Sequence, residues 1–431
     1  MKIQTVLSII IILLNIYITP SNAQQIDTTR ITRIKELESQ IDSLRTTINA
    51  MVKELQQIKQ NMAGGKSDVD ELIALLNNED VETVSVESRS RRKRVDALLK
   101  AITQRPGQLR FNGGATTTIQ HGSGTNSRRH TTGVGSFDFY AHTAFGANTL
   151  LFFDLEAIGG NGPDDFFLTF SGLNGDAGST QDEDGIDRLN VLEAWVEFSF
   201  LKKIFTITAG KIDLTNYFDN NASANDETMQ FISGAFVNNS AFAVPGNAPG
   251  LRLRTTLLNR FHFQLGLSNV HNSAKDLLKE VYKIASIGFT LFPGSEFEAN
   301  FRFFGYQHPL ADDATGWGIS FDKVTFGAYN IFARYGQNDA KMAGYWGVQS
   351  SWSAGTRFVE QIAGQSTALG LAYGENTPSL ENLKTEQIVE IYARRQLNQW
   401  THISPHLQLV WNGKGASNPL MIFGVRTHFN F

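Results

Sequence analysis

The sequence contains no cysteine. This absence excludes disulfide bonds and sites in which cysteine ligates zinc or an iron–sulfur cluster. Beyond the apolar run at the N-terminus, no segment reaches the roughly 18 consecutive apolar residues that mark a membrane-spanning helix. If the rest of the chain lies in a membrane, it must therefore do so as a closed β-barrel, because open sheet edges and loops cannot face lipid.

A strong charge of one sign is also missing. The formal net charge is -4, and this balance gives no indication of nucleic acid as a partner. The sequence has no G-x-S-x-G, no H-E-x-x-H and no glycine-rich phosphate loop, and its histidines are scattered. We therefore predict no catalytic residues, no enzyme activity, no metal site and no cofactor.

The N-terminus has the pattern of an export signal. Lys2 supplies a positive charge, residues 6–18 form an apolar core, and Ser21-Asn22-Ala23 matches a small–x–small cleavage site. The apolar run is shorter than the ~20 residues of a spanning helix, which favours cleavage over a retained anchor. We predict a signal peptide over residues 1–23 and mature protein from Gln24.

Residues 24–63 carry heptads. Apolar residues alternate spacings of three and four without a break, with charged residues between them, and this pattern predicts a coiled coil. A single amphipathic helix lying on another domain is the alternative, but the narrow, strictly heptad stripe favours pairing between helices. Ile at a with Leu at d favours two strands, and the later heptads leave the strand number open. The predicted self-association residues are Ile34, Leu37, Ile41, Leu44, Ile48, Met51, Leu55 and Ile58.

Residues 64–107 are predicted to form a helical, basic linker. Gly64 and Gly65 end the coiled coil, and a basic run follows at residues 89–94. Such a run is more often a solvated helix face than a binding site. The sharper alternative is docking to an acidic periplasmic polymer or to lipid headgroups.

From residue 108 to the C-terminus the hydrophobic pattern has period two. Segments of about ten residues alternate apolar and polar side chains and are separated by Gly, Asn, Asp and Pro, which is typical of a transmembrane barrel. A soluble β-sandwich also alternates, but these segments are long for a sandwich, and one face is rich in Phe, Leu and Ile. We predict an all-β fold over residues 108–431, a transmembrane antiparallel β-barrel of about 16 strands, preceded by a periplasmic α-helical coiled coil.

Short and long connections alternate along this part of the chain. We expect the short turns at the periplasmic end and the long links outside. The short turns are predicted at residues 146–148, 201–203, 258–260, 292–294 and 398–399. The longer links are predicted at about 159–189, 213–248, 269–280, 305–315 and 411–419. The last strand alternates and ends on Phe431, which resembles the C-terminal pattern read by the barrel-assembly machinery.

An ordered set of motifs lies between residues 193 and 252. The motifs are Glu193-Ala194-Trp195, Thr208-Ala209-Gly210-Lys211, residues 213–218, Phe231 followed by residues 233–239, and Pro249-Gly250-Leu251-Arg252. Together with residues 403–415 and 424–427, this set resembles the carbohydrate-selective porin family, the OprB-like porins, over about residues 108–431. The coiled coil lies outside the classical barrel domain of that family and is similar to the coiled coils of some envelope-anchored porins. The resemblance implies a sixteen-stranded, often trimeric barrel that passes sugars without energy input.

Strand parity then assigns the side chains that face the channel, because residues that alternate with lipid-facing aromatics must point inward. A lining of mixed charge lacks the ring of one sign that a phosphate or cation pore needs. It suits neutral hydroxylated solutes, since Arg and Glu exchange hydrogen bonds with sugar hydroxyls. The alternative is that these charges pair across the lumen and keep it wet. The candidate solute-binding residues are Glu193, Trp195, Glu197, Arg252, Arg254, Glu298, Arg302, Arg334, Glu390, Tyr392, Arg394 and Arg426.

Residues 214–248 are the candidate constriction loop, and a plain extracellular loop is the alternative. The interpretation favoured by the whole sequence is an outer-membrane porin of a Gram-negative-type cell, with its N-terminal segment in the periplasm. Its expected partners are small hydrophilic solutes, sugars above all, outer-membrane lipid and further copies of the chain, with a trimer favoured. An ion- or metal-preferring porin of the same fold and an envelope tether acting through the coiled coil stay open as alternatives.

Overall fold

The structure is a computed structural model. It describes residues 107–124, 129–146, 148–177, 188–201, 203–271, 274–293, 295, 297–325, 329–416 and 419–431. The predicted signal peptide, coiled coil and basic linker lie outside the described residues, and so do the predicted self-association residues.

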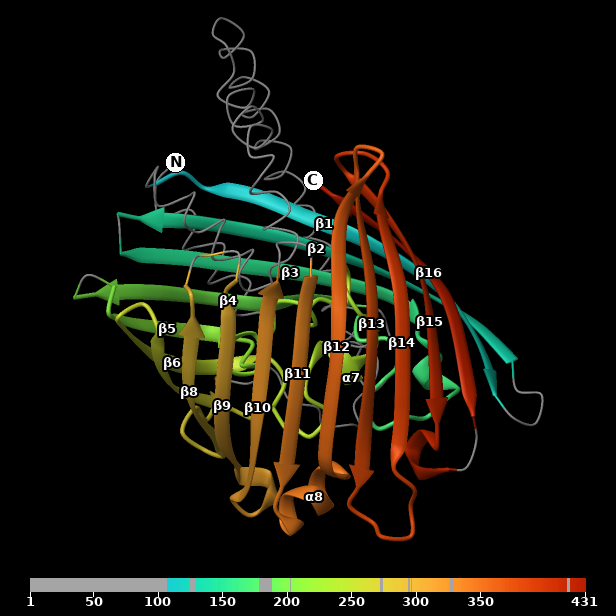
Figure 1. Ribbon diagram of the computed structural model, residues 1–431. Coiled ribbons are helices and arrows are strands. Elements are labelled where there is room, and N and C mark those ends of the chain that lie inside the picture. Colours follow the sequence, from blue (N-terminus) through green and yellow to red (C-terminus); the bar gives the residue numbers. More distant parts are fainter. Residues whose placement is uncertain are drawn as a thin grey trace, which may run out of the picture. The chain divides into compact units, whose positions relative to one another are not determined.

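The described chain forms one closed antiparallel barrel of sixteen strands (Figure 1). Each strand pairs with its neighbour in sequence, and β1 pairs with β16 to close the sheet. The first eight strands are β1 (Arg110–Gly124), β2 (Arg129–Phe145), β3 (Thr149–Asn161), β4 (Arg188–Phe200), β5 (Phe205–Ile212), β6 (Ala248–Leu257), β7 (Phe261–Asn269) and β8 (Val281–Leu291). The remaining eight are β9 (Ala299–His308), β10 (Ala314–Thr325), β11 (Tyr329–Asn338), β12 (Val348–Ile362), β13 (Gln365–Pro378), β14 (Glu386–Gln396), β15 (Thr401–Trp411) and β16 (Leu420–Asn430). The predicted fold class and strand number are confirmed.

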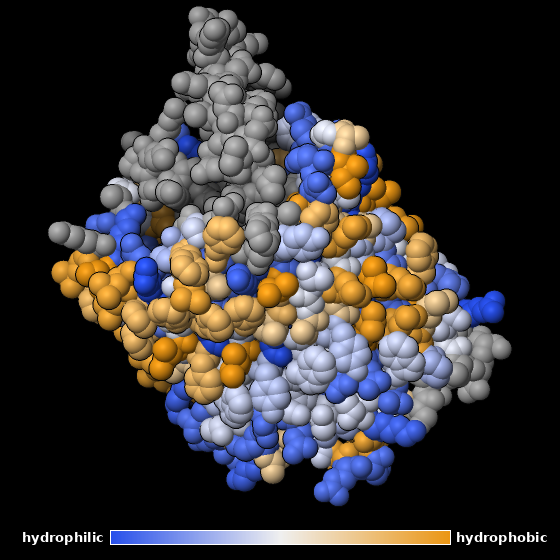
Figure 2. Space-filling view, viewed as in Figure 1, coloured by the Kyte–Doolittle hydropathy of each residue, from blue (hydrophilic) through white to orange (hydrophobic). Residues whose placement is uncertain are grey.

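Alternation along each strand separates an apolar outer face from a polar inner face. On β7, Phe263 and Leu265 are 42% and 57% exposed on the outside. On β1, Thr116 and Thr118 point inward and are buried. Figure 2 shows the outer apolar side chains as a belt across the barrel wall. An outward apolar band with a polar interior is the arrangement that allows a barrel to sit in lipid.

Aromatic side chains border the two ends of this belt. Near the short turns, rings on neighbouring strands meet in pairs such as Phe261 with Phe289, whose centroids are 5.0 Å apart. At the other end of the strands, Trp352 lies 5.3 Å from Tyr373. Girdles of aromatic residues at both interfaces are typical of outer-membrane barrels.

Most connections follow the predicted alternation of short and long links. The long link predicted at about 305–315 is wrong, because β9 runs to His308 and β10 begins at Ala314, so that this link is shorter than the β8–β9 turn at residues 292–298. The connections carry the short helices η1 (Pro163–Asp165), α6 (Thr215–Phe218), α7 (Gly234–Val237), η2 (Pro309–Ala311), α8 (Ala340–Trp346) and η3 (Gly413–Gly415). Among the described residues, no helix has the length and apolar character needed to cross a membrane.

The seam between the first and last strands is closed by the C-terminal residue. The amide of Phe431 donates to the carbonyl of Gly113 at 3.1 Å, and the amide of Gly113 donates back at 3.0 Å. The Phe431 ring stacks on Phe137 at 5.5 Å. On β16, Arg426 is buried on the inner face while Phe429 is 44% exposed, which is the predicted parity of the closing strand.

Gly113 should be intolerant of a side chain. A Cβ at this position would lie 2.3 Å from the carbonyl oxygen of Asp138 and 2.7 Å from the Phe431 ring. We expect Gly113→Val to strain the seam by about 1–3 kcal/mol and to lower the fraction of heat-modifiable, folded barrel on unheated gels. The matched control is Gly135→Val on the neighbouring strand, where the nearest atom to a Cβ is 4.0 Å away. Equal folding of the two variants would contradict the prediction.

Candidate functional site

The link between β5 and β6, residues 213–247, folds into the barrel; we refer to it as the inner segment. Its backbone contacts inward side chains from strands around the circumference. Gln264 on β7 donates to the carbonyl of Tyr217 at 3.1 Å, and the amide of Ala243 donates to the Tyr306 hydroxyl on β9 at 3.1 Å. Further contacts reach β16, where Arg426 donates to the carbonyl of Gln230 at 2.8 Å. Contacts from β7 to β16 place this segment across the lumen, as the constriction-loop interpretation requires.

Apolar side chains explain why the inner segment leaves solvent. Phe218, Phe231, Phe236 and Phe242 are all 0–2% exposed. Phe242 packs on Phe304 and Tyr306, and Phe231 packs on Phe332 and meets Tyr392 edge to face. Burial of these rings favours the interior position over a solvated extracellular loop.

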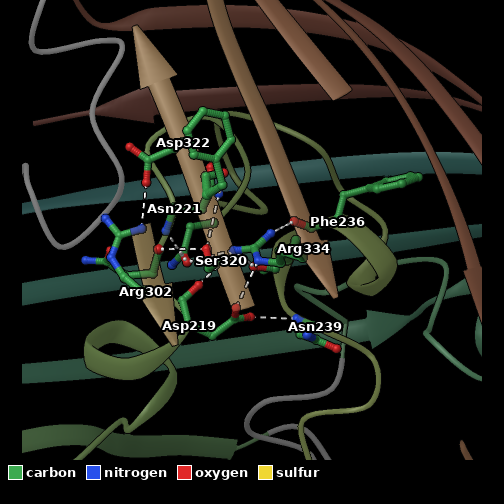
Figure 3. Close-up of polar contacts among 12 residues, drawn as sticks. Asp219, Asn221, Phe236, Asn239, Arg302, Ser320, Asp322 and Arg334 are labelled. Atoms are coloured by element: carbon green, nitrogen blue, oxygen red, sulfur yellow. Dashed lines mark hydrogen bonds and ion pairs between the residues drawn. The ribbon is translucent and has the colours of Figure 1, made fainter. Parts of the chain in front are cut away.

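One end of the inner segment is held by a buried ion pair, Asp219 with Arg334 on β11 (Figure 3). The Arg334 Nε and the Asp219 Oδ1 are 3.1 Å apart. The same guanidinium donates to the carbonyls of Phe236 at 2.6 Å and Val237 at 3.2 Å. Asp219 also accepts from the amide of Asn239 at 2.6 Å. A buried pair persists only when further hydrogen bonds satisfy both partners, and here they do.

The other end is held by β14 and β16. Glu390 accepts from the amides of Ile232 at 2.8 Å and Ser233 at 2.9 Å. Arg426 donates to the carbonyl of Gln230 at 2.8 Å, and Arg394 donates to the carbonyl of Met229 at 3.3 Å. Wall charges thus act as capping groups for backbone that belongs to no helix or sheet.

A second segment, residues 162–177 between β3 and β4, joins the inner segment; we refer to it as the rim segment. The amide of Gly175 donates to the carbonyl of Ile232 at 2.7 Å, and the amide of Gly234 donates to that of Gly172 at 3.2 Å. Glu386 at the start of β14 accepts from the amide of Phe170 at 2.8 Å. The two segments therefore form one hydrogen-bonded body inside the barrel.

Asp164 closes the rim segment on itself. Its carboxylate accepts from the amides of Leu173 at 2.8 Å and Asn174 at 3.0 Å. Burial raises the pKa of Asp164 to about 6, and the nearby charge of Asp165 also raises it. The hydrogen bonds from the two amides favour the charged form and act in the opposite direction. Desolvation outweighs the hydrogen bonds at this carboxyl.

Most of the predicted solute-binding residues lie on the inner face but are covered. Arg252 stacks on the Tyr217 ring at 4.1 Å and pairs with Glu197. Trp195 stacks on Phe152 at 4.9 Å and donates to Glu193. The buried members of the predicted set are Glu193, Trp195, Glu197, Arg252, Arg334, Glu390, Tyr392, Arg394 and Arg426.

Three predicted residues stay partly exposed: Arg254, Glu298 and Arg302. Arg254 is on β6 and Arg302 on β9, whereas Glu298 comes just before β9, which begins at Ala299. The structure thus divides the predicted set into nine buried residues and three whose side chains keep partial exposure on the inner side of the wall.

Sequence reasoning missed several residues that organise the interior. Glu386 was given no role. Asp219 and Asn239 lay in the candidate constriction loop, residues 214–248, which was predicted without roles for single residues. The density of phenylalanine between residues 218 and 242 was the available signal, since a solvated loop rarely carries so many apolar rings. In the described part of the chain, no group of three or more His, Cys, Asp or Glu side chains could hold a metal ion.

Comparisons with known proteins agree with this architecture. Residues 340–431 match the family model described as carbohydrate-selective porin, OprB family. A protein of Aquifex aeolicus (strain VF5), described only as uncharacterized, is 27% identical over 252 residues, which is 58% of this chain and 72% of that protein. The predicted resemblance to this porin family is confirmed.

Two solved structures of Pseudomonas putida OprB are similar in fold. The high-pH structure has a TM-score of 0.60 at 13% identity and covers 75% of this chain and 94% of that one. The low-pH structure has a TM-score of 0.51 at 12% identity and covers 80% and 99%. At these identities the likeness concerns the fold alone.

Breaking the buried pair should release the inner segment. Arg334→Met leaves Asp219 and the carbonyls of Phe236 and Val237 without their donor, and we expect a cost of about 3–5 kcal/mol to the closed segment. Chymotrypsin should then cleave within residues 213–247 of the folded barrel, and it should leave the native protein, in which the phenylalanine rings of this segment are buried, uncut. Arg395→Met, an exposed position on β14, is the control. Resistance equal to the native protein would show that the pair does not hold the segment.

The raised pKa of Asp164 makes the rim segment sensitive to pH. A carboxyl whose folded pKa exceeds its unfolded value stabilises the closed form below the unfolded pKa of 3.8, and this contribution is lost as pH rises through about 6. We expect proteinase K to cleave within residues 162–177 faster at about pH 7.5 than at about pH 5, after correction with an unstructured peptide. Asp164→Asn should remove this difference. A difference that persists in the variant would assign it to another group.

Proposed function

We propose that this chain is an outer-membrane porin through which small hydrophilic solutes, sugars above all, diffuse passively. The observation that supports it most directly is a closed barrel with an apolar belt outside and a folded segment across a polar lumen. Non-strand backbone lies at membrane depth only where protein buries it or where it lines a cavity. The inner segment meets that condition, because its backbone and apolar rings are buried inside the barrel. We infer that it narrows the passage.

Charge pairing in the lumen supports a neutral solute. Arg252 pairs with Glu197, Arg302 with Asp322, and Arg334 with Asp219. Paired charges produce little net field along the axis, whereas a pore for one ion type needs a ring of a single sign. Arg302, which keeps partial exposure, can exchange hydrogen bonds with hydroxyls at little net cost, because each bond replaces one that the sugar made with water.

Arg254, Glu298 and Arg302 are the wall residues that we propose as direct solute contacts. They are the predicted residues whose side chains keep partial exposure. The other nine act indirectly, by fixing the position of the inner segment and therefore the width of the passage. Charge-assisted hydrogen bonds from guanidinium and carboxylate groups give these contacts their strength.

The N-terminal segment completes the proposal. The chain enters the barrel at the end of β1 that lies beside the short turns, which supports a periplasmic position for residues 24–107. Self-association of this segment through the heptads, with a trimer favoured, would then hold barrels together from the periplasmic side.

Planar-bilayer recording tests the function. Purified full-length protein should give stepwise conductance that added oligosaccharide reduces, with a small reversal potential in a salt gradient. Complete absence of conductance would overturn the porin function. A large reversal potential, with no effect of sugar, would favour the ion-preferring alternative instead.

Shortening the inner segment should widen the passage. We expect replacement of residues 222–241 by a short Gly-Ser linker to raise single-channel conductance severalfold, because the replaced stretch lies inside the barrel. The control is a Gly-Ser replacement of residues 274–280, the link between β7 and β8. Unchanged conductance in the first variant, with the barrel folded, would place the narrowest point elsewhere.

A further inference from the structure

A continuous row of polar side chains crosses the inner wall from β6 to β10, and we refer to it as the polar ladder. It occupies the half of the wall next to the short turns, since β6 and β7 turn at residues 258–260 and β8 and β9 turn at residues 292–298. The polar ladder consists of Arg254, Thr256, His262, Thr290, Asn300, Asp322 and Arg302.

Its first part is centred on His262. The His262 Nδ1 lies 3.2 Å from the hydroxyl of Thr256 and 3.4 Å from an Nη2 of Arg254. The opposite ring nitrogen, Nε2, lies 3.0 Å from the hydroxyl of Thr290. Three strands are thereby joined through the side chains of β6, β7 and β8.

The second part continues through Asn300. The Thr290 hydroxyl donates to the Asn300 Oδ1 at 2.9 Å, and the Asn300 Nδ2 donates to Asp322 at 2.9 Å. Arg302 donates to the other oxygen of Asp322 at 2.6 Å (Figure 3). A guanidinium therefore stands at each end of the ladder, with hydroxyl, imidazole and amide groups between them.

The polar ladder begins where the inner segment ends. Arg254 pairs in register with Gln264, whose side chain donates to the carbonyl of Tyr217 in the inner segment. Arg302 pairs in register with Ser320, whose hydroxyl accepts from the side-chain Nδ2 of Asn221 at 3.4 Å. Unlike the buried Arg334, Arg394 and Arg426, the two ladder arginines keep partial exposure, and so do Thr256 and His262. The other ladder members, Thr290, Asn300 and Asp322, are buried and hold these groups in place. A solute that has passed the inner segment therefore meets these groups next.

Gly288 keeps the centre of the ladder free of a side chain. It is paired with His262 on one side and Arg302 on the other, and it has the inward parity. The nearest atoms to a Cβ built there are the Phe301 carbonyl at 3.4 Å and the His262 Cβ at 3.5 Å. An added side chain would fit without distorting the backbone and would extend between His262 and Arg302.

We propose that the polar ladder is a sugar-binding subsite on the periplasmic side of the inner segment. Neighbouring ladder groups alternate as donors and acceptors, and vicinal sugar hydroxyls present the same alternation. Binding is weak, because every ladder group already has a protein partner and exchanges one bond for another. Weak binding at successive sites is what passage through a pore requires. This inference rests on the proposed porin function and adds a location to it.

The test measures block of conductance by maltotriose added from either side of a planar bilayer that holds full-length, oriented protein. Block from the short-turn side should weaken roughly fivefold in Thr256→Val and again in His262→Leu, since each removes about one hydrogen bond to the sugar from a ladder group that keeps partial exposure. Gly288→Leu should weaken it too, although it removes no hydrogen-bonding group. Each block is expressed relative to the variant's own conductance, and heat-modifiability confirms folding.

Two matched controls separate this effect from general perturbation. Thr116→Val removes a buried inward hydroxyl on β1, across the lumen, and Gly305→Leu adds an outward side chain on β9 where the nearest atom is 3.9 Å away. Both should keep native block. Three results would overturn the inference. They are native block in all three ladder variants, a loss of block in the controls equal to that in the ladder variants, and stronger block by inorganic phosphate than by sugar. Absence of conductance in the native protein would instead overturn the porin function itself.

Discussion

The interior of this barrel depends on satisfying backbone groups that no hydrogen bond within a helix or a sheet satisfies. The inner and rim segments carry such groups into the lumen, where an unpaired amide or carbonyl costs free energy comparable to a lost hydrogen bond. Inward charges supply the missing partners: Arg334 donates to the carbonyls of Phe236 and Val237, and Glu390 accepts from the amides of Ile232 and Ser233. Every other feature of the lumen is arranged around these contacts.

This constraint divides the charged residues into two groups with different consequences. Residues such as Arg426 and Arg394 donate to carbonyls of the inner segment and are 2% exposed, so they fix the shape of the passage. Arg254 and Arg302 lie in the half of the wall next to the short turns and keep partial exposure. The two arginines that position the inner segment and the two that we propose as solute contacts therefore lie on different strands.

Strands and parity could be predicted from the sequence because both depend on a local period of two. Inward placement of Glu390 or Arg426 follows from their immediate neighbours. Their partners could not be predicted, since Arg334 and Asp219 are 115 residues apart and Glu390 and Ser233 are 157 apart. The rim segment was interpreted only as a long link, because its position depends on Glu386, 216 residues away from Phe170. The resemblance to carbohydrate-selective porins supplied the family, and only the folded chain supplied the contacts.

The position of Arg426 on the closing strand has a consequence for biogenesis. Gln230 of the inner segment receives its hydrogen bond from β16, which pairs with β1 to close the sheet. Without β16, the inner segment lacks Arg426, one of the side chains that hold it. Closure of the sheet and completion of the inner segment's hydrogen bonds are therefore coupled, because the bond from Arg426 to Gln230 exists only where β16 has joined the wall.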